Sequence, residues 1–210
     1  RAMAKRLGME VGDLIGKKCF TIWKAGEKCN DCILERVIKS REQKKMELTN
    51  EMGEFWLVRA YPVMGTDGEV SGVVEVSEDI TERKRASKKL EAAFDALVRT
   101  ASDIVSARDP YTADHQRNVS KLAVAMGREM GLNDEICESI RVAGLLHDIG
   151  KITVPTELLT RLGKLNEIEF DLIKEHSRSG YEILKDVDLP WPVAEIVLQH
   201  HERLDGSGYP

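Results

Sequence analysis

The interval from Glu82 to Asp109 contains neither glycine nor proline. Those two residue types interrupt regular helices, so the whole interval can form one long helix. Charged residues crowd the start of this interval. Such a helix divides the chain into three parts, and we predict that they comprise residues 1–80, 81–107 and 108–210.

Apolar residues recur along this predicted helix with spacings of 4, 3, 4 and 3, at Leu90, Phe94, Leu97, Ala101 and Ile104. That spacing forms a heptad seam, which is typical of a short two-stranded coiled coil. The alternative is a single amphipathic helix that lies on its own domain. The coiled-coil interpretation predicts a parallel homodimer that forms through residues 82–107.

Charge and hydropathy restrict the class of protein. The formal net charge is −5, which argues against the broad basic surface of a nucleic-acid-binding protein. The sequence has no apolar run of the ~18 residues that a membrane span requires. We therefore expect a cytoplasmic protein, although a longer parent protein could be membrane-anchored upstream. The four cysteines lack a regular framework, which fits a reducing compartment.

The first 80 residues read as a mixed α+β domain. Helices are expected over Met3–Leu7 and Asp31–Ser40. Three strand-like runs follow, at Lys45–Met52, Glu54–Met64 and Val70–Ser77. The middle run alternates in character from residue to residue, as a strand with two different faces requires.

Cys29 and Cys32 form a CxxC pair, with Cys19 nearby. That spacing suits a metal, a cluster or a redox pair. No histidine and no second CxxC lies near them, so a structural or incidental role is the favoured interpretation. Core packing is the expected role of the aromatic residues Trp23, Phe55 and Trp56.

From Asp109 onward the pattern is helical throughout. One apolar stripe runs through Val119–Met126 and stops at Gly131. The next helix is predicted to begin at Asn133 and to end at Gly150. Further along, Asn166 and Glu169 resemble a capping box, and Pro192 suits the first turn of a last helix. We therefore predict an all-α bundle for this part.

Histidines occur only in this helical part, at His115, His147, His176, His200 and His201. Imidazole and carboxylate groups are common ligands of iron, manganese and zinc. Asp148 follows a strongly apolar run, where a carboxylate is costly unless a cation compensates it. The alternatives are a helix end where His147 and Asp148 meet solvent, and five unrelated histidines. The distribution over several helices favours a polynuclear metal site.

Three motifs carry a resemblance to a known family: His147-Asp148-Ile149-Gly150-Lys151, then His176, then the run from His200-His201 to Gly208-Tyr209-Pro210. Together they resemble the HD-GYP family of cyclic di-GMP phosphodiesterases, and Asp109–His115 resembles its opening motif. The resemblance implies a helical bundle that holds iron or manganese. Such an enzyme hydrolyses cyclic di-GMP to pGpG and/or GMP.

The resemblance also implies roles for individual residues. The first metal would be held by His115, His147 and Asp148, with Asp148 bridging to the second. The second metal would be held by His176, His200 and His201. Catalysis would involve Asp148 and Lys151, and substrate would contact Lys151, Asp205, Gly208, Tyr209 and Pro210.

Two departures from the family pattern matter. Members with a third metal carry a glutamate four residues before the first ligand histidine, where this chain has Tyr111. We therefore expect two metals. The last metal-ligating aspartate of the family lies beyond the Pro-containing loop, so we expect a C-terminally truncated domain.

Residues 1–85 resemble a PAS sensor domain. Asp79-Ile80-Thr81-Glu82-Arg83 is similar to the end of that fold, and Gly16–Phe20 is similar to its central helical connection. We expect the first two PAS strands to be missing from this sequence. The sequence does not identify a PAS ligand.

These resemblances predict a signal-regulated, metal-dependent phosphodiesterase. One alternative is a phosphohydrolase for another cyclic dinucleotide or a nucleotide. Another is a catalytically silent adaptor that binds nucleotide or a diguanylate cyclase (GGDEF) protein through Gly208-Tyr209-Pro210. The complete set of histidines with Asp148 and Lys151 favours an enzyme.

Overall fold

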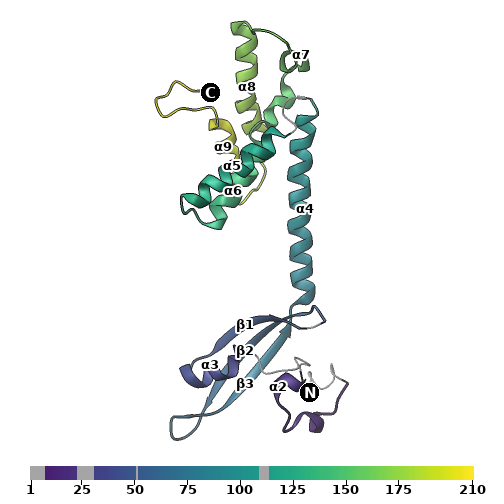
Figure 1. The fold of residues 1–210 in the computed structure, drawn as a ribbon, viewed down its shortest axis with the longest axis vertical. Helices are drawn as coiled ribbons and strands as arrows, with labels where there is room; N and C mark the ends of the chain where they lie inside the picture. Colours follow the sequence, from purple (N-terminus) through teal and green to yellow (C-terminus); the bar gives the residue numbers. More distant parts are fainter. Residues whose placement is uncertain (1–7, 23–30, 51, 109–113) are drawn as a thin grey trace. The chain divides into compact units, whose positions relative to one another are not determined.

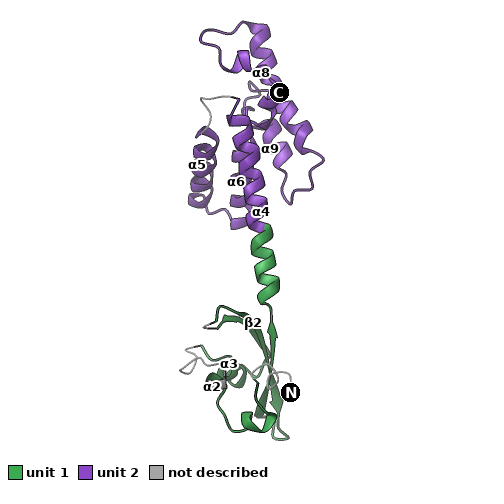
Figure 2. Ribbon diagram, turned by 90° about the vertical axis from the view of Figure 1, so that its right-hand side faces the viewer, with its two compact units in different colours: residues 1–90 green, residues 91–210 purple. Residues whose placement is uncertain are grey.

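The computed structural model describes residues 8–22, 31–50, 52–108 and 114–210. The chain forms two compact units, Arg1–Leu90 and Glu91–Pro210 (Figure 2). The helix predicted over Met3–Leu7 lies outside the described residues. None of the described helices combines the length and the apolar character that a bilayer crossing requires.

The first unit contains an antiparallel three-stranded sheet in the order β1-β2-β3 (Figure 1). Its strands are β1 (Lys44–Thr49), β2 (Phe55–Met64) and β3 (Val70–Asp79). All three predicted strands are therefore confirmed. β1 ends before the predicted Met52 because Asn50 forms a turn, in which its Oδ1 accepts a hydrogen bond from the Glu54 N–H at 2.9 Å.

Helix α3 (Ile33–Ser40) packs on one face of this sheet and confirms the helix predicted there. Two shorter elements, η1 (Val11–Leu14) and α2 (Cys19–Ile22), precede it. Trp56, Val58 and Ala60 alternate inward along β2 and meet Ile33 and Val37. The period of two along β2 thus builds the core of this unit.

Three aromatic residues were expected in the core. Trp56 is buried there, as predicted. Phe55 is only half-buried, with the Lys88 ammonium 5.0 Å from the centre of its ring, so that expectation was wrong. Trp23 lies outside the described residues, as does Cys29 of the CxxC pair. Cys32 is the N-cap residue of α3.

The long helix predicted from the sequence is α4 (Thr81–Ser106). Its start is held by Thr81, whose backbone N–H donates to Asp79 Oδ1 at 2.9 Å and whose Oγ1 accepts from the Phe55 N–H at 2.9 Å. The helix runs through the residues at which the two units divide.

The five positions of the predicted heptad seam do not share one environment. Phe94 and Ala101 pack against the core of the second unit. Leu90, Leu97 and Ile104, which are spaced by seven residues, are 73%, 70% and 52% exposed. The second half of α4 is thus an amphipathic helix on its own domain, as in the alternative interpretation, and it keeps an exposed apolar row.

The second unit is all-helical, as predicted. After α4 it contains α5 (His115–Glu129), α6 (Asp134–Leu146), η2 (Ile149–Thr153), α7 (Thr156–Leu159), α8 (Glu167–Leu184) and α9 (Val193–Gln199). Asn133 caps α6 by accepting a hydrogen bond from the Ile136 N–H at 2.9 Å. The capping box of Asn166 and Glu169 at the start of α8 is also confirmed.

The core of this unit lies between α4, α6, α8 and α9. Val142, Val193 and Val197 are completely buried in it, beside Leu146 and Leu184. The predicted end of α6 at Gly150 was wrong, because the helix ends at Leu146 and Gly150 lies in η2. The change of direction after Leu146 turns Asp148 inward, where only 2% of it is exposed.

Candidate metal centre

Asp148 lies at the centre of the histidine cluster. Its Oδ2 is 3.3 Å from His147 Nε2 and 2.8 Å from Lys151 Nζ. Its Oδ1 is 3.5 Å from His176 Nε2 and 4.0 Å from His200 Nε2. The two carboxylate oxygens therefore face different sets of histidines.

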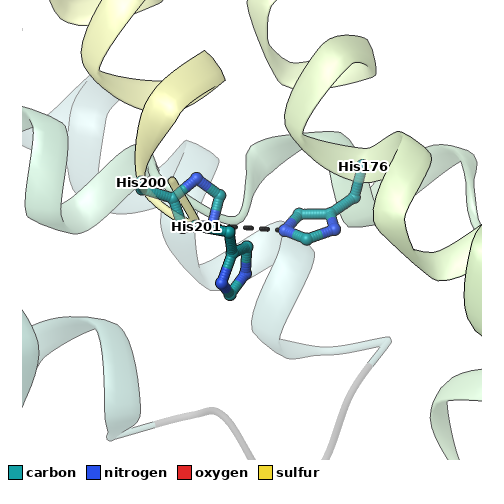
Figure 3. Close-up of side chains that lie close together, drawn as sticks. All are labelled: His176, His200 and His201. Carbon is teal, nitrogen blue, oxygen red and sulfur yellow. Dashed lines mark hydrogen bonds between the residues drawn. The ribbon is translucent and has the colours of Figure 1, made fainter. Parts of the chain in front are cut away.

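The ligand atoms form two groups of three, in each of which they lie within 4.8 Å of one another. One group comprises His115, His147 and Asp148, and the other comprises His176, His200 and His201. Four segments supply them: the start of α5, the end of α6, the middle of α8 and the end of α9. Figure 3 shows the second group, in which His176 projects from α8 toward the two histidines that follow α9.

Three of the histidines have the ring orientation that metal binding requires. The Nδ1 atoms of His147, His176 and His200 lie 2.9, 2.5 and 2.6 Å from the carbonyl oxygens of Gly144, Ile173 and Val197. A carbonyl oxygen can only accept, so in each contact Nδ1 carries the proton and donates. In the neutral imidazole this leaves Nε2, which faces the cluster, as the nitrogen that can bind a metal, as in metal-ligating histidines. The donor set therefore fits divalent cations.

Electrostatics keep Asp148 ionised. Its burial alone would raise the pKa of the carboxyl, but contact with His147 and Lys151 outweighs burial and holds the pKa well below its usual range. Burial opposes protonation of His147 as well, yet the protonated imidazole can donate from Nε2 to Asp148, and this contact raises the pKa of His147. The first group thus contains a permanent negative charge.

The second group is electrostatically different. Burial lowers the pKa of His176. Burial, reinforced by neighbouring histidines, lowers the pKa values of His200 and His201 to about 4. These imidazoles are therefore neutral at physiological pH, which is the protonation state that a metal ligand needs.

Gly150 allows η2 to lie against α8 at the cluster. A Cβ atom at this position would collide with the carbonyl oxygen of His176 and with the backbone nitrogen of Gly180. Gly180 is also tightly packed, since a Cβ there would lie 2.7 Å from Val197 Cγ1. The two glycines let the backbone that carries Asp148 approach the helix that carries His176.

The C-terminal loop reaches the second group through Tyr209. The Tyr209 ring stacks on His201, with centroids 4.6 Å apart and planes inclined by 24°. A Cβ at Gly208 would lie 2.5 Å from Glu202 Cα, so the loop closes tightly on itself. Asp205 is exposed and accepts hydrogen bonds from Ser207 N at 3.0 Å and Ser207 Oγ at 2.7 Å, and Pro210 is exposed.

Two family models match the chain. A PAS domain model matches residues 1–82, and an HD domain model matches residues 99–210. The chain belongs to the HD domain family. The predicted order, a PAS domain followed by an HD domain, is thereby confirmed.

Curated relatives match the HD domain. A cyclic di-GMP phosphodiesterase of Pseudomonas aeruginosa is 42% identical over 103 residues, which are 49% of this chain and 25% of the relative. A cyclic di-GMP phosphodiesterase of Thermotoga maritima is 42% identical over 105 residues, 49% of this chain and 28% of the relative. A 3′3′-cGAMP-specific phosphodiesterase of Vibrio cholerae is 41% identical over 109 residues, 52% of this chain and 25% of the relative. The chain thus spans about a quarter of the length of these relatives.

The structure brings all six predicted metal ligands of the HD domain together, with Lys151 beside Asp148 and Tyr209 beside His201. Tyr111 lies outside the described residues. Sequence reasoning missed Gln116, which follows His115 and is 1% exposed. No local pattern in the sequence marks Gln116, because its burial depends on the packing of α5 against α4.

Proposed function

We propose that the HD domain is a metal-dependent phosphodiesterase that hydrolyses cyclic di-GMP to pGpG and/or GMP. The observation that carries this proposal is the position of Asp148, whose two oxygens face the two groups of histidines. Relatives that bear the name cyclic di-GMP phosphodiesterase, at 42% identity, support the choice of substrate.

Two divalent metals would occupy the site, one held by His115, His147 and Asp148 and the other by His176, His200 and His201. Imidazole with carboxylate suits iron and manganese, which we propose as the metals. The chemistry that such a metal pair supplies is activation of water as a nucleophile and neutralisation of charge on the phosphate. Asp148 would hold both metals at a fixed separation, because its carboxylate is buried and ionised.

Other residues would bind the substrate. The Lys151 ammonium lies 2.8 Å from Asp148 Oδ2, close enough to the ligand groups to contact a phosphate of the substrate. The Tyr209 ring, stacked on His201, would form one wall of the site. Gly208 and Pro210 would shape this loop, and Asp205 would orient it through Ser207.

A second candidate substrate is another cyclic dinucleotide. Relatives named 3′3′-cGAMP-specific phosphodiesterases match the HD domain at 41% and 35% identity, much as the cyclic di-GMP enzymes do. Both classes of substrate have two phosphodiester bonds in a ring, so the same metal centre suits either. The bases would be distinguished outside the metal centre.

A third candidate is a silent adaptor that binds nucleotide or a GGDEF protein through the loop of Gly208-Tyr209-Pro210. The complete ligand groups argue against silence, since an adaptor has no chemical need for two groups of three potential metal ligands. We propose that such a partner, where one binds, modulates an active enzyme.

Regulation would come from the PAS domain. We propose a cytoplasmic protein with a sensor part in residues 1–80, a signalling helix in residues 81–107 and a catalytic part in residues 108–210. The exposed row of Leu90, Leu97 and Ile104 supports a homodimer through residues 82–107.

The proposal is tested with the full-length protein, loaded anaerobically with Fe²⁺ or Mn²⁺. It is incubated separately with cyclic di-GMP, 3′3′-cGAMP and cyclic di-AMP, and linear products are separated by chromatography. We expect turnover of cyclic di-GMP that is lost in His147→Ala and His200→Ala. Turnover in these variants equal to that of the unmodified protein would overturn the metal assignment. Turnover of 3′3′-cGAMP faster than that of cyclic di-GMP would overturn the choice of substrate. Nucleotide binding without any product would favour the adaptor.

A further inference from the structure

A buried polar contact joins α4 to the start of α5. Gln116 is 1% exposed, and its Oε1 accepts hydrogen bonds from Ser106 Oγ at 2.5 Å and from Ser102 Oγ at 3.2 Å. Ser102 and Ser106 lie one turn apart on α4 and are 4% and 6% exposed. Ser106 Oγ also lies 3.0 Å from the Ser102 carbonyl oxygen.

Ser102 and Ser106 share α4 with two buried apolar residues, Val98 and Val105, and Gln116 reaches these serines from α5. A buried amide that loses its partners costs about 1–3 kcal/mol, so Gln116 has a strong preference for the geometry in which both hydroxyls reach it. A slide or rotation of α4 would break these hydrogen bonds. The contact therefore fixes the register of α4 against α5.

The contact lies next to a predicted metal ligand. Gln116 is the residue after His115 in the first turn of α5. Asp114, the N-cap residue of this helix, makes no side-chain capping hydrogen bond. The first turn of α5 is instead bonded to α4, through Gln116 and through Arg117, whose Nη2 lies 2.6 Å from Asp103 Oδ1.

Arg108, two residues after the end of α4, contacts the segment that carries Lys151. The Arg108 guanidinium donates to the carbonyl oxygen of Ile152 in η2, and its Nη2 lies 3.1 Å from Thr156 Oγ1. The last turns of α4 and the residues directly after it thus touch two of the segments that build the candidate metal centre, α5 and η2.

We propose that Ser102, Ser106 and Gln116 position His115, so that the register of α4 sets the metal affinity of the group formed by His115, His147 and Asp148. This inference rests on the metal assignment in the proposed function. Gln116 acts through its neighbour, because its own amide bonds α4. A ligand must be held within about 0.5 Å of its productive place, and loss of a supporting partner typically weakens metal binding by about 10- to 100-fold.

The test uses the full-length protein with Mn²⁺ as the probe. Binding is followed by calorimetric titration and by the electron paramagnetic resonance spectrum of bound Mn²⁺. We expect Ser102→Ala combined with Ser106→Ala, and Gln116→Leu separately, to weaken one of two Mn²⁺ sites by about 10- to 100-fold. The other site should keep its affinity, and Ser106→Thr, which retains the hydroxyl, should behave like the unmodified protein.

A matched control is Ser120→Ala. Ser120 is 3% exposed and its Oγ donates to the Arg141 carbonyl oxygen at 2.9 Å, so it also provides a buried hydroxyl bond from α5. Its hydroxyl bonds the Arg141 backbone and not the Gln116 amide, so its loss should lower the melting temperature without changing either Mn²⁺ affinity. If it weakens the same Mn²⁺ site as strongly as the Gln116 variant does, the effect is general packing and the positioning role is wrong.

His115→Ala separates failure of this inference from failure of the proposed function. If His115→Ala binds Mn²⁺ as the unmodified protein does, the metal assignment itself is wrong. If His115→Ala loses one site while the serine and Gln116 variants keep both affinities, the positioning role alone is overturned. If Gln116→Leu fails to fold, the Mn²⁺ affinities of Ser106→Ala and Ser106→Thr are compared instead. A positioning role requires that only Ser106→Ala weakens one site.

Discussion

Phe94 and Leu97, one turn apart on α4, are in different environments. Phe94 packs against the core of the HD domain, whereas Leu97 is 70% exposed. The two residues belong to the same heptad pattern in the sequence, but only Leu97 remains free to meet a second chain. Stability of the HD domain therefore depends on Phe94, whereas a dimer formed through α4 would depend on the exposed row that contains Leu97.

We predict that Leu97→Glu weakens dimerisation and leaves the melting temperature nearly unchanged. It would place like charges in the exposed row, where a buried leucine otherwise contributes about 1.5–3 kcal/mol. Phe94→Glu should instead lower the melting temperature, because it buries a charge in the core. Ala96→Glu, an exposed position with the same change of charge, is the control. Light scattering that finds a monomer for the unmodified full-length protein would dispose of the dimer.

Asp148→Asn should abolish hydrolysis and reduce bound metal while the fold is kept. An amide cannot give a negatively charged oxygen to each ligand group. Since loss of a supporting partner alone costs about 10- to 100-fold, loss of a bridging ligand should lower turnover by more than about 100-fold. Exposed Asp186→Asn serves as the control. Near-normal turnover with full metal content would contradict the bridging role.

The protein should bind two metals per chain or fewer. Tyr111 stands where family members with a third metal carry glutamate, and a phenol is a poor ligand for a divalent metal beside histidines. Elemental analysis of the purified protein provides the measurement. Tyr111→Phe should leave the stoichiometry unchanged, and three tightly bound metals in either protein would show this expectation to be wrong.

Acidification should release the metal of the first group before that of the second. Burial opposes protonation of His147, but contact with Asp148 raises its pKa, so protons compete for its Nε2 at a higher pH than for an ordinary histidine. His200 and His201 have pKa values lowered to about 4 and stay neutral until much lower pH. The measurement is the metal content of each variant after dialysis at a series of decreasing pH values. His200→Ala, which retains the first group, should lose its metal at a higher pH than His147→Ala, which retains the second group. The reverse order would refute this assignment.

Gly150→Ala should destabilise the HD domain and weaken metal binding together. The added methyl group would collide with the His176 carbonyl oxygen, so η2 must move away from α8 and take Asp148 with it. Overpacking of this kind typically costs about 1–3 kcal/mol. Thermal unfolding and metal titration measure the two effects. Gly12→Ala is the matched control, because a Cβ at Gly12 meets nothing within 4 Å. If Gly150→Ala binds metal as tightly as Gly12→Ala does, the packing argument is wrong.

The sequence was sufficient for features that depend on local periodicity or on a motif. The alternation along β2 and the lack of glycine and proline after Glu82 predicted a strand and a long helix that the structure contains. The histidine motifs predicted ligand groups that the bundle brings together. These features require only neighbours in the chain or a strongly specific pattern.

Features that depend on contacts between distant helices were missed or misjudged. Gly150 resembles a helix end in the sequence, but in the structure it lies in η2 and allows that segment to pack closely against α8. Gln116 has no local signal, because its partners Ser102 and Ser106 lie on another helix. Phe94 and Leu97 look equivalent until the bundle covers one of them.

The carbonyl contacts of His147, His176 and His200 have a consequence for the entropy of metal binding. Each imidazole is anchored by a backbone oxygen within its own turn, so its rotamer is selected when the helix folds. Ordering a free side chain costs about 0.5–1.5 kcal/mol. For these three predicted ligands that ordering is completed before any cation arrives. The main remaining cost of metal binding would then be the removal of water from the ion.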